Sequence, residues 1–483
     1  MVVTAVVRPS GPTRSRSFGS AETIGRPAWI ALVVAGSMSL VVGLAVTAMN
    51  IALPAIERDF RGTSRSTLSW GITGYSITVA SLILVGGRLA DRIGRRRVFR
   101  AGVALFTVAS VCLAVAPSAW VFLGARLGQG VGAALLSPSA LTLILPMFPA
   151  SRQMTAIASW TALSNLGSAI GPSLAAVVTQ QLSWRWIFVI PLVVCVPTLV
   201  LAPRLLPEGL STADEPGPID MIGVALGTLA VGLLAFTIVH APGVGWTSRV
   251  VAICAIGVVV CATVFVRRSL HHPEPLLDLG LFRHRTVWAA NLANVFLAAA
   301  GLSIWLVYPL FLVQHWHYSL LRTGLAITPV PLVSAIASLF AGRLAERVGE
   351  RRVIAWGAVV PLLGAAWLTW RLGPEVAYLR DLLPGALLFS AGFGLVFSPL
   401  TAAAMKGVPI AQLGQANAAF NALRSLAAGL GVAVVVAFLG NDEVIPVRAF
   451  HRAVLSVAGM TLLGWLVMAS CYPRGRQSLG EEK

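Results

Sequence analysis

The chain has 483 residues, of which 57% are hydrophobic and only 11% are charged, and its formal net charge is +18. Soluble domains carry roughly 25% charged residues, so this composition excludes a water-soluble enzyme or binding domain of this size. The basic residues lie in short clusters between long apolar runs, which excludes a nucleic-acid-binding surface and is typical of a polytopic membrane protein.

Fourteen apolar runs are long enough to cross a hydrocarbon core as helices, which takes about 20 residues each. The first run is longer than the apolar region of a signal peptide, so it is expected to be retained as a helix. The chain is therefore predicted to be an all-α membrane protein with two cytoplasmic tails, a disordered one at 1–27 and a short one at 474–483. The predicted spans are 28–50, 68–87, 98–117, 119–146, 156–179, 187–206, 220–240, 249–267, 287–313, 323–342, 353–371, 381–404, 415–439 and 453–472.

The distribution of basic residues predicts how these spans are oriented. With the N-terminus inside, 24 of the 36 basic residues fall in inside segments and 10 in outside loops, and the other two, Arg126 and Arg424, lie within spans. This bias satisfies the positive-inside rule. We therefore expect a multi-pass protein of the plasma (inner) membrane with both termini in the cytoplasm.

An internal repeat predicts the domain organisation. Residues 87–97, after the second span, read GRLADRIGRRR, and residues 342–352, after the tenth span, read GRLAERVGERR, with eight of eleven positions identical. Eight helices separate the copies, so both have the same orientation. The repeat predicts two parallel six-helix bundles, at 28–207 and 286–473, with two inserted helices in 208–285. Transporters built from two such halves bind substrate between them and alternate access by rocking.

The acidic residues of the repeat are candidate gate residues. Asp91 lies among arginines, and it can pair with them or with the N-terminus of a helix in the opposite half. Such contacts would hold one conformation and break in the other. In the second copy Glu346 replaces Asp91 and Glu350 stands in place of Arg95, so the second contact is expected to be electrostatically weaker. The alternative interpretation is a topology signal only. The candidate gating residues are Gly87, Asp91, Arg92, Gly94 and Arg95, with Gly342, Glu346 and Gly349 in the second copy.

Three sites inside the spans interrupt otherwise apolar sequence. Arg126 lies in the fourth span, where a charge costs about 2.5–3.5 kcal/mol, so it is expected to face the protein interior or a cavity. Gln129 lies on the same helix face. Arg424, in the thirteenth span, has the same interpretation, and for both the alternative is snorkelling to the nearer interface. Gly171 and Pro172 should kink or hinge the fifth span.

Uncharged polar and aromatic side chains recur in several of the spans. Each is as consistent with a hydrogen bond between helices as with a substrate contact. None of the eighteen acidic residues lies at the middle of a span. Because a cavity for cations would be expected to present a buried anion, neutral or anionic amphipathic substrates are favoured. The candidate cavity residues are Thr47, Asn50, Trp70, Tyr75, Asn165, Asn294, Tyr308, Asn417, Asn421 and Arg424.

Several of these stretches resemble motifs of a known family. Residues 87–97 resemble the loop between helices two and three of the major facilitator superfamily. RLGQGVG at 126–132 and GSAIGP at 167–172 are similar to its RxxQGxG and gxxxGP motifs, and TAMNIALP at 47–54 resembles a motif of the fourteen-helix drug:proton antiporters. The resemblance covers about residues 28–473. It implies the major facilitator fold, multidrug or antibiotic efflux, and coupling roles for Arg126, Gln129, Gly171 and Pro172.

One position departs from that branch. Its members usually carry an acid five residues before the asparagine of the first-span motif, and here that position is Ala45. A proton carrier needs a group that titrates near neutral pH, which burial can produce in a carboxylate. Proton coupling is therefore expected to be weak or absent, or else to run through Asp91, Asp381 or an external histidine.

The sequence predicts a secondary exporter of drugs or toxic metabolites, a monomer whose partners are the bilayer, a small-molecule substrate and, as an open alternative, protons. Two other functions stay open: a facilitator or importer of a metabolite or lipid-like solute, and a non-transporting scaffold or sensor. No P-loop, hydrolase elbow or zinc helix is present in the sequence. Catalysis, a cofactor, a metal site and a nucleic-acid partner are therefore not expected.

Overall fold

The computed structural model describes residues 25–63, 65–149, 152–208, 220–245, 247–273, 275–409, 412–439 and 445–473. The predicted C-terminal tail, and all but the last three residues of the predicted N-terminal tail, lie outside these ranges. Fourteen helices within the described residues are long and apolar enough to cross a membrane. The prediction of an all-α membrane fold with fourteen spans is therefore confirmed.

The helices fall into two groups joined by a helical hairpin. The first group is α1 (Arg26–Asp59), α2 (Arg65–Ile93), α3 (Arg95–Ala114), α4 (Ala119–Ile144), α5 (Gln153–Gln181), α6 (Trp186–Val189) and α7 (Leu192–Leu205). The hairpin is α8 (Met221–Val244) and α9 (Arg249–His271). The second group is α10 (Arg285–Gln314), α11 (Leu320–Ile327), α12 (Pro329–Val348), α13 (Glu350–Arg371), α14 (Leu383–Met405), α15 (Leu413–Leu439) and α16 (Val447–Cys471).

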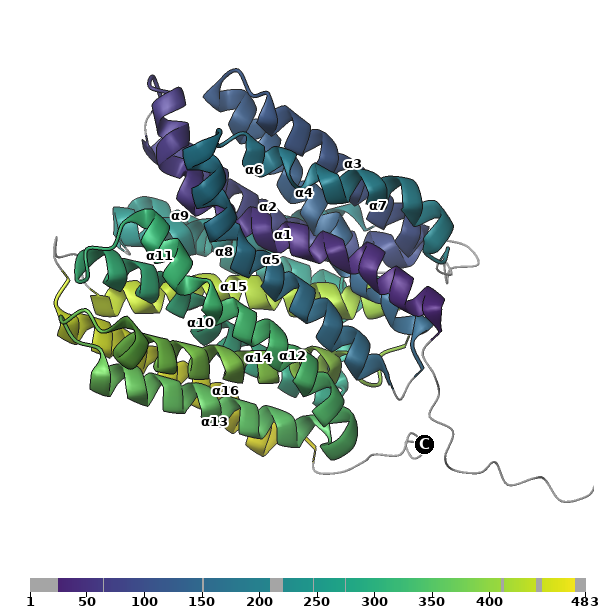
Figure 1. The fold of residues 1–483 in the computed structure, drawn as a ribbon. Coiled ribbons are helices and arrows are strands. Elements are labelled where there is room, and N and C mark those ends of the chain that lie inside the picture. The colour runs from purple at the N-terminus through teal and green to yellow at the C-terminus, as the bar shows by residue number, and fades with distance from the viewer. Residues whose placement is uncertain are drawn as a thin grey trace, which may run out of the picture.

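Each group packs mainly on itself, and the two meet chiefly along two pairs of helices. In Figure 1 most of the purple to blue helices lie above the green to yellow ones, and α5 and α15 run between the groups. The meeting pairs are α5 with α12 and α2 with α15. The hairpin helix α8 contacts both α2 and α15, so it lies over that second pair. These two pairs bring together residues that are far apart in the sequence.

Two of the predicted spans are interrupted at prolines, and a third begins irregularly. The sixth span is divided into α6 and α7 around Pro191, and the tenth into α11 and α12 at Pro329. A proline has no N–H to donate and its ring clashes with the preceding turn. The twelfth span begins with a π-helical turn, Tyr378–Leu382, before α14.

The predicted loops after the second and tenth spans are mostly helical, which corrects the sequence-based boundaries. Helix α2 continues to Ile93 and α12 to Val348. A single glycine, Gly94 (φ 102°) or Gly349 (φ 90°), then turns the chain into the next helix. Only glycine adopts such a positive φ without strain. Asp91 therefore lies on the last turn of α2 rather than after it.

Candidate functional site

Asp91 binds the buried N-terminus of a helix in the opposite group. Its Oδ1 accepts a hydrogen bond from the backbone N–H of Gly414 (3.2 Å), and its Oδ2 accepts one from the N–H of Gln415 (3.0 Å). Both donors lie in the first turn of α15, whose N–H groups have no partner within the helix. Arg95 pairs with Oδ1 at 3.3 Å. The carboxylate is only 6% exposed, and it thus caps α15 from another helix, where a negative charge is favourable.

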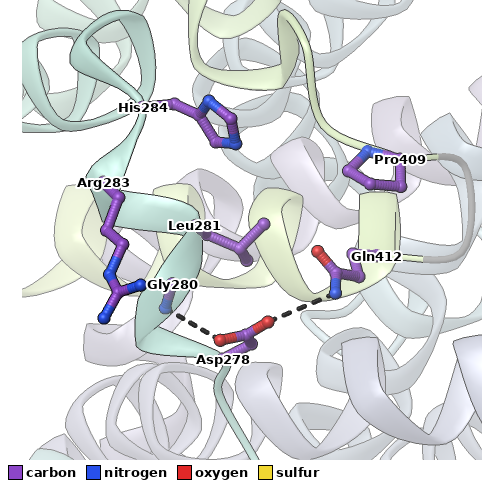
Figure 2. A pocket seen from close by; sticks show the side chains of 7 residues that line it. All are labelled: Asp278, Gly280, Leu281, Arg283, His284, Pro409 and Gln412. Carbon is purple, nitrogen blue, oxygen red and sulfur yellow. Dashed lines mark hydrogen bonds between the residues drawn. The ribbon is translucent and has the colours of Figure 1, made fainter. Parts of the chain in front are cut away.

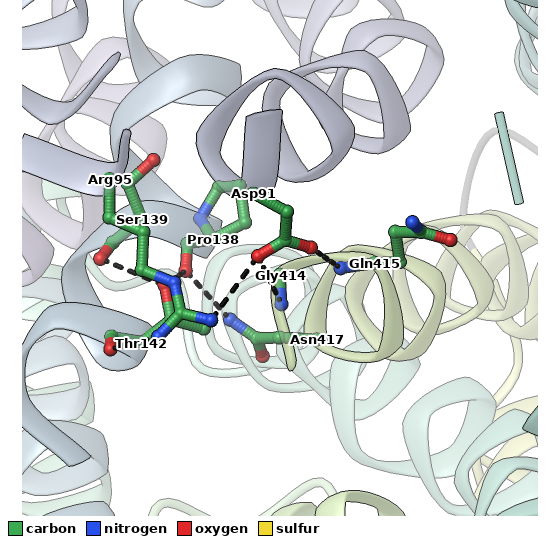
Figure 3. Close-up of polar contacts among 8 residues, drawn as sticks. All are labelled: Asp91, Arg95, Pro138, Ser139, Thr142, Gly414, Gln415 and Asn417. Carbon is green, nitrogen blue, oxygen red and sulfur yellow. Dashed lines mark hydrogen bonds and ion pairs between the residues drawn. The ribbon is translucent and has the colours of Figure 1, made fainter. Parts of the chain in front are cut away.

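A second layer of contacts supports Asp91 (Figure 3). The Nη1 of Arg95 donates to the carbonyl oxygen of Thr142 on α4 (3.1 Å). Asn417 on α15 donates to the carbonyl oxygen of Pro138, also on α4 (3.3 Å). One carboxylate, one guanidinium and one amide thus connect α2, α3 and α4 to the first two turns of α15.

Glu346 makes the equivalent contact with the groups exchanged. Its Oε1 accepts hydrogen bonds from the backbone N–H of Thr155 (3.0 Å) and from the Thr155 hydroxyl (2.7 Å), in the first turn of α5. Its Oε2 pairs with Arg152 at 3.3 Å. In each group the second helix therefore ends against the fifth helix of the other. We call these two contacts, centred on Asp91 and Glu346, the latches, and the end of the bundle that carries them the latch end.

The expectation that the second latch is weaker does not match these contacts. Glu350, which takes the place of Arg95, binds Lys406 (3.2 Å) and the Tyr472 hydroxyl (2.8 Å). Its negative charge is thus paired with Lys406 rather than directed at Glu346. Arg152, from the opposite group, supplies the positive charge instead. The ion pair of Glu346 crosses between the groups, whereas that of Asp91 lies within one group.

Two glycines allow the groups to approach at the latch end. A Cβ atom on Gly87 would lie 2.5 Å from both the Gly414 oxygen and the Ala418 Cβ, and one on Gly342 would lie 2.5 Å from the Ala158 Cβ. Such distances are impossible without movement of a helix. Of the predicted gate residues, Gly87 and Asp91 thus meet α15, and Arg95 is linked to it through Asp91. Arg92 is half-buried on the last turn of α2.

Arg126 is buried within the first group, as the sequence predicts. Its Nε donates to the carbonyl oxygen of Gly71 (2.8 Å) and its Nη1 to the Oε1 of Gln129 (2.5 Å). The guanidinium stacks 4.4 Å from the centre of the Tyr75 ring. Gln129 in turn donates to the Ser110 hydroxyl (2.9 Å). Arg126 thus connects α2, α3 and α4, and among the described residues no carboxylate pairs with it.

Gly171 and Pro172 lie where α5 crosses α1 and faces α11. A Cβ on Gly171 would collide with the Thr47 hydroxyl, and Thr47 donates across to the carbonyl oxygen of Ser168 (3.3 Å). Pro172 lies 3.8 Å from the position that a Cβ of Gly324 would take. Helix α5 continues through both residues to Gln181. The close approach of α1 is therefore clear, whereas no break in α5 accompanies the proline.

Several candidate cavity residues bind other helices instead. Trp70 stacks on Phe236 of α8 at 5.8 Å, and Asn294 donates to the Phe420 carbonyl oxygen (2.9 Å). Tyr308 is 1% exposed, and its hydroxyl has no partner among the described residues. The side chain of Asn50 lies outside the described part of the structure.

Other candidates lie where the groups face each other. Asn165 on α5 donates to the Ser334 hydroxyl of α12 (3.1 Å). Asn421 donates to the Oδ1 of Asn417 (2.9 Å), one turn earlier on α15. Arg424 follows them on α15 and is partly exposed. Asn165 and Asn417 therefore bridge the two groups, and Asn421 and Arg424 follow Asn417 on α15.

A pocket of about 430 Å³ opens beside the Asp91 latch (Figure 2). Asp278, on the segment before α10, accepts hydrogen bonds from the N–H of Gly280 (2.8 Å) and from Gln412 (3.2 Å). The Asp278 N–H donates to the side chain of Gln415 (3.1 Å), whose own N–H binds Asp91. The segment after the hairpin is thus fastened to the turn of α15 that receives the latch.

Sequence reasoning missed the partners of both acids. Gly414, Gln415 and Thr155 act mainly through backbone N–H groups, which leave no sign in the identity of the residue. Arg152 was visible only as one of many basic residues near a span end. The signal that could have found them is positional, because each lies at or within four residues before the predicted start of the fifth span of its half.

Comparison with known proteins gives one family. The profile of the Major Facilitator Superfamily matches residues 35–432. The chain is 33% identical over 452 residues to the multidrug efflux pump LfrA of Mycolicibacterium smegmatis, covering 92% of this chain and 86% of LfrA. It is 32% identical over 415 residues to the multidrug resistance protein Stp of Mycobacterium tuberculosis, covering 85% and 76%. It is 34% identical to the puromycin resistance protein pur8 of Streptomyces alboniger, covering 84% and 81%.

Two solved structures share the fold at low sequence identity. The proton:xylose symporter XylE superimposes with a TM-score of 0.66 and 16% identity, covering 92% of this chain and 96% of XylE. The human organic anion transporter MFSD10 gives a TM-score of 0.60 and 15% identity, covering 92% and 98%. At these identities the likeness concerns the arrangement of the helices alone.

Proposed function

The chain belongs to the Major Facilitator Superfamily, and from this premise we propose that it is a secondary active transporter that exports small amphipathic molecules by alternating access. Relatives named for multidrug efflux and for resistance to puromycin, matched over more than four fifths of this chain, support export of drug-like molecules. The observation that carries the mechanism is the pair of latches, in which each group holds the fifth helix of the other through one carboxylate. Rocking of two halves about a central site requires contacts of this reversible kind.

We propose that the latch end faces the cytoplasm and that the described conformation is closed on that side. The excess of basic residues in the predicted inside segments supports this orientation. In this orientation both termini are cytoplasmic, in the plasma membrane. Of two reporter enzymes fused after residue 473, the one that works only in the cytoplasm should be active and the one that works only outside should be inactive. Activity of the second reporter would contradict the orientation.

In this scheme 28–207 and 286–473 move as two bodies. Breaking the Asp91 and Glu346 contacts would open the latch end, and a molecule bound between the halves at Asn165, Asn417 and Asn421 would exchange with the cytoplasm. Re-forming the contacts would carry the site to the outside. Each latch contact is weak enough to break in every cycle, because a carboxylate at a helix N-terminus contributes up to about 2 kcal/mol.

We propose that proton coupling is weak. Ala45 is buried in α1, and among the described residues every acid of a spanning α-helix lies in its first or last turn. A carboxylate deep in the bilayer, which could be tuned to titrate near neutral pH, is therefore missing from the described helices.

The proposed transporter acts as a monomer.

The test of export is a comparison of drug susceptibility in a pump-deficient host that carries the wild type, an empty vector or Asp91→Asn. Export predicts a raised inhibitory concentration for some compounds with the wild type only. Counterflow of such a compound in proteoliposomes should follow. If accumulation rises with the wild type, the protein imports, and if no compound moves in either direction, the transporter proposal is wrong.

A further inference from the structure

Arg126 and Arg424 are the two arginines that the sequence places within the predicted spans, and their surroundings in the structure differ. Arg126 is 1% exposed and bonded to Gly71 and Gln129, with its guanidinium on the Tyr75 ring. Arg424 is partly exposed and has no hydrogen bond, ion pair or ring contact to any described residue. The guanidinium of Arg126 thus has two hydrogen-bond partners and an aromatic ring, whereas that of Arg424 has no partner among the described residues.

Arg424 lies near the middle of the bilayer. It is eleven residues from the start of α15 at Leu413, which corresponds to roughly 16 Å along a helix. That distance is about half of a hydrocarbon core roughly 30 Å thick. A guanidinium at this depth is too far from either membrane surface to be hydrated by snorkelling.

The face of α15 that carries Arg424 points into the bundle. Arg424 is seven residues after Asn417, so the two lie about 20° apart around the helix. Asn417 contacts Pro138 of the opposite group, and Ala427, one turn after Arg424, packs on Ala298 and Ala299 of α10. Of the exposed large hydrophobic residues of α15, Leu430 and Val434 lie about 120° and 80° from Arg424 around the helix, and Phe438, at the far end of the helix, lies about 40° from it.

An unpaired cation in an apolar bundle needs a counter-charge or water. No acid of the described chain supplies one, and Asn421 and Asn417 are already bonded to each other. A bound anion would be held by up to five N–H donors in the planar fork that matches a carboxylate. The partner that would complete the site is therefore none of the described side chains.

We propose that Arg424 binds the anionic group of the transported molecule, so that the preferred substrates are amphipathic organic anions bearing a carboxylate. This inference rests on the proposed export function and names its substrate class. The apolar surroundings of Arg424 would receive the hydrophobic part of the molecule. The positive charge would at the same time disfavour monovalent cations.

The test uses a matched pair of probes, a lipophilic fluorescent carboxylate and its methyl ester, in vesicles that contain the purified protein. The variants are Arg424→Gln, Arg424→Lys and the control Arg448→Gln, which removes an exposed arginine in the first turn of α16. Binding of the same probes to detergent-solubilised protein is measured by fluorescence anisotropy. The wild type should bind and transport the carboxylate better than the ester.

Arg424→Gln should lower both affinity and transport of the carboxylate by about tenfold or more, the usual value of a charge-assisted pair, and leave the ester within about twofold. Arg424→Lys should retain part of the preference, and Arg448→Gln should match the wild type. Equal handling of the carboxylate by wild type and Arg424→Gln would overturn the inference, and so would parallel loss of both probes. If the wild type transports the ester but neither binds nor moves the carboxylate, only this inference fails. If the wild type moves no probe and no other compound, the export function fails.

Discussion

Charged side chains in the spanning helices are compensated in distinct ways. Asp91 and Glu346 accept N–H groups from helix N-termini, and each also pairs with an arginine. Arg126 donates to a carbonyl and an amide oxygen and lies on an aromatic ring. These arrangements differ in permanence. The partners of Arg126 belong to its own half, whereas the carboxylates are bonded to the half against which they must move.

Replacing Asp91 by Asn should slow transport by roughly tenfold or more without removing the protein from the membrane. The amide keeps the size of the side chain, but it loses the attraction to the α15 N-terminus and leaves Arg95 without its carboxylate. The closed conformation then becomes harder to reach in each cycle. Efflux of a transported compound, normalised to the amount of protein in the membrane, provides the measurement.

The matched variant is Glu346→Gln, and the structure changes what it should do. The sequence predicted a milder effect, but the contacts with Thr155 and Arg152 predict a loss of similar size. Exposed Glu375→Gln is the control and should behave as the wild type. Undiminished efflux in Asp91→Asn would reduce the repeat to a topology signal, and a much smaller effect at Glu346 would restore the earlier expectation.

At the level of single residues, the sequence could identify the latch acids but not their partners. Asp91 and Glu346 stand out because a repeated motif places an acid next to arginines. Gly414 lies 323 residues after Asp91, and it contributes only a backbone N–H. Nothing in a side chain marks such a donor. Arg424 was recognised as unusual, but only the structure separates it from Arg126, because the difference lies in bonds made by other helices.

Whole helices, by contrast, followed closely from hydropathy. All fourteen predicted spans correspond to described helices, and the errors lie at their ends. Residues 88–93 were assigned to a loop because three of them are charged. Helix α2 nevertheless continues through them, since no helix breaker occurs before Gly94 and the Asp91 carboxylate is bonded to α15. Breaks at Pro191 and Pro329 were missed because a proline inside an apolar run does not by itself show whether the helix continues.

The approach of α2 to α15 predicts a strong effect of a small substitution. Gly87→Ala should favour the conformation that is open at the latch end, because the added Cβ would lie 2.5 Å from the Gly414 oxygen and the Ala418 Cβ. Spin labels at exposed Arg97 and Arg347, in a variant without the native cysteines, would report the separation of the halves.

The expected result for Gly87→Ala is a shift of the distance distribution to longer values. The control is Gly124→Ala on α4, where a Cβ meets no atom within 4 Å. Its distribution should match that of the background protein. An unchanged distribution in Gly87→Ala would mean that the two helices do not approach as closely as described.

The hairpin α8–α9 is fastened at one end by Asp220, which predicts a pH dependence. Its Oδ1 accepts from the N–H of Gly223 (2.8 Å) and from Arg268 (2.6 Å). Burial opposes ionisation, but the hydrogen bonds from Gly223 and Arg268, with the charge of Arg268, outweigh it and lower the pKa of Asp220 below its ordinary value. A lowered folded-state pKa contributes stability above the unfolded value, about 3.9, and this stability is lost as the pH falls through the folded value.

Thermal unfolding of the wild type and Asp220→Asn in detergent, from about pH 7 down to about pH 3, measures this contribution. The wild type should melt at the higher temperature at neutral pH, and the gap should narrow below about pH 4. Glu375→Gln, at an exposed carboxylate, controls for general effects of acid. A gap that stays constant over the whole range would show that the charge of Asp220 does not stabilise the hairpin.

In the molecule as a whole, each half makes the same kind of latch contact with the other. Among the described residues, however, no carboxylate lies at the proposed site between the halves. A cation that enters this site would gain no charge to offset its lost hydration, and Arg424 would repel it. An acid introduced at Ala45 would add both a titratable group and a negative charge. Ala45→Asp should therefore increase the response of transport to an imposed pH gradient and improve efflux of monovalent cationic dyes.

Dye efflux and proton release in vesicles, for the wild type and Ala45→Asp, give the measurement. Ala45→Asn is the matched control, since it adds the same volume without the charge, and it should produce neither gain. Stoichiometric exchange of a cationic dye for protons by the wild type would contradict the expectation. The proton would then have to be carried by an interfacial acid such as Asp91 or Asp381.

The position of α8 makes the two joints between the halves, α2 with α15 and α5 with α12, differ in what covers them. At the joint between α2 and α15, helix α8 packs over both helices: Phe236 stacks on Trp70, and Ile238 lies beside Gly429. The helices that touch both α5 and α12 at the opposite joint, α11 and α14, belong to the second half itself. Among the described helices, only the joint along α2 and α15 is therefore covered by a helix from outside the two halves. The approximate twofold symmetry of the latches therefore does not extend to the hairpin. A molecule that entered from the lipid would meet α8 at one joint between the halves and only helices of the two halves at the other.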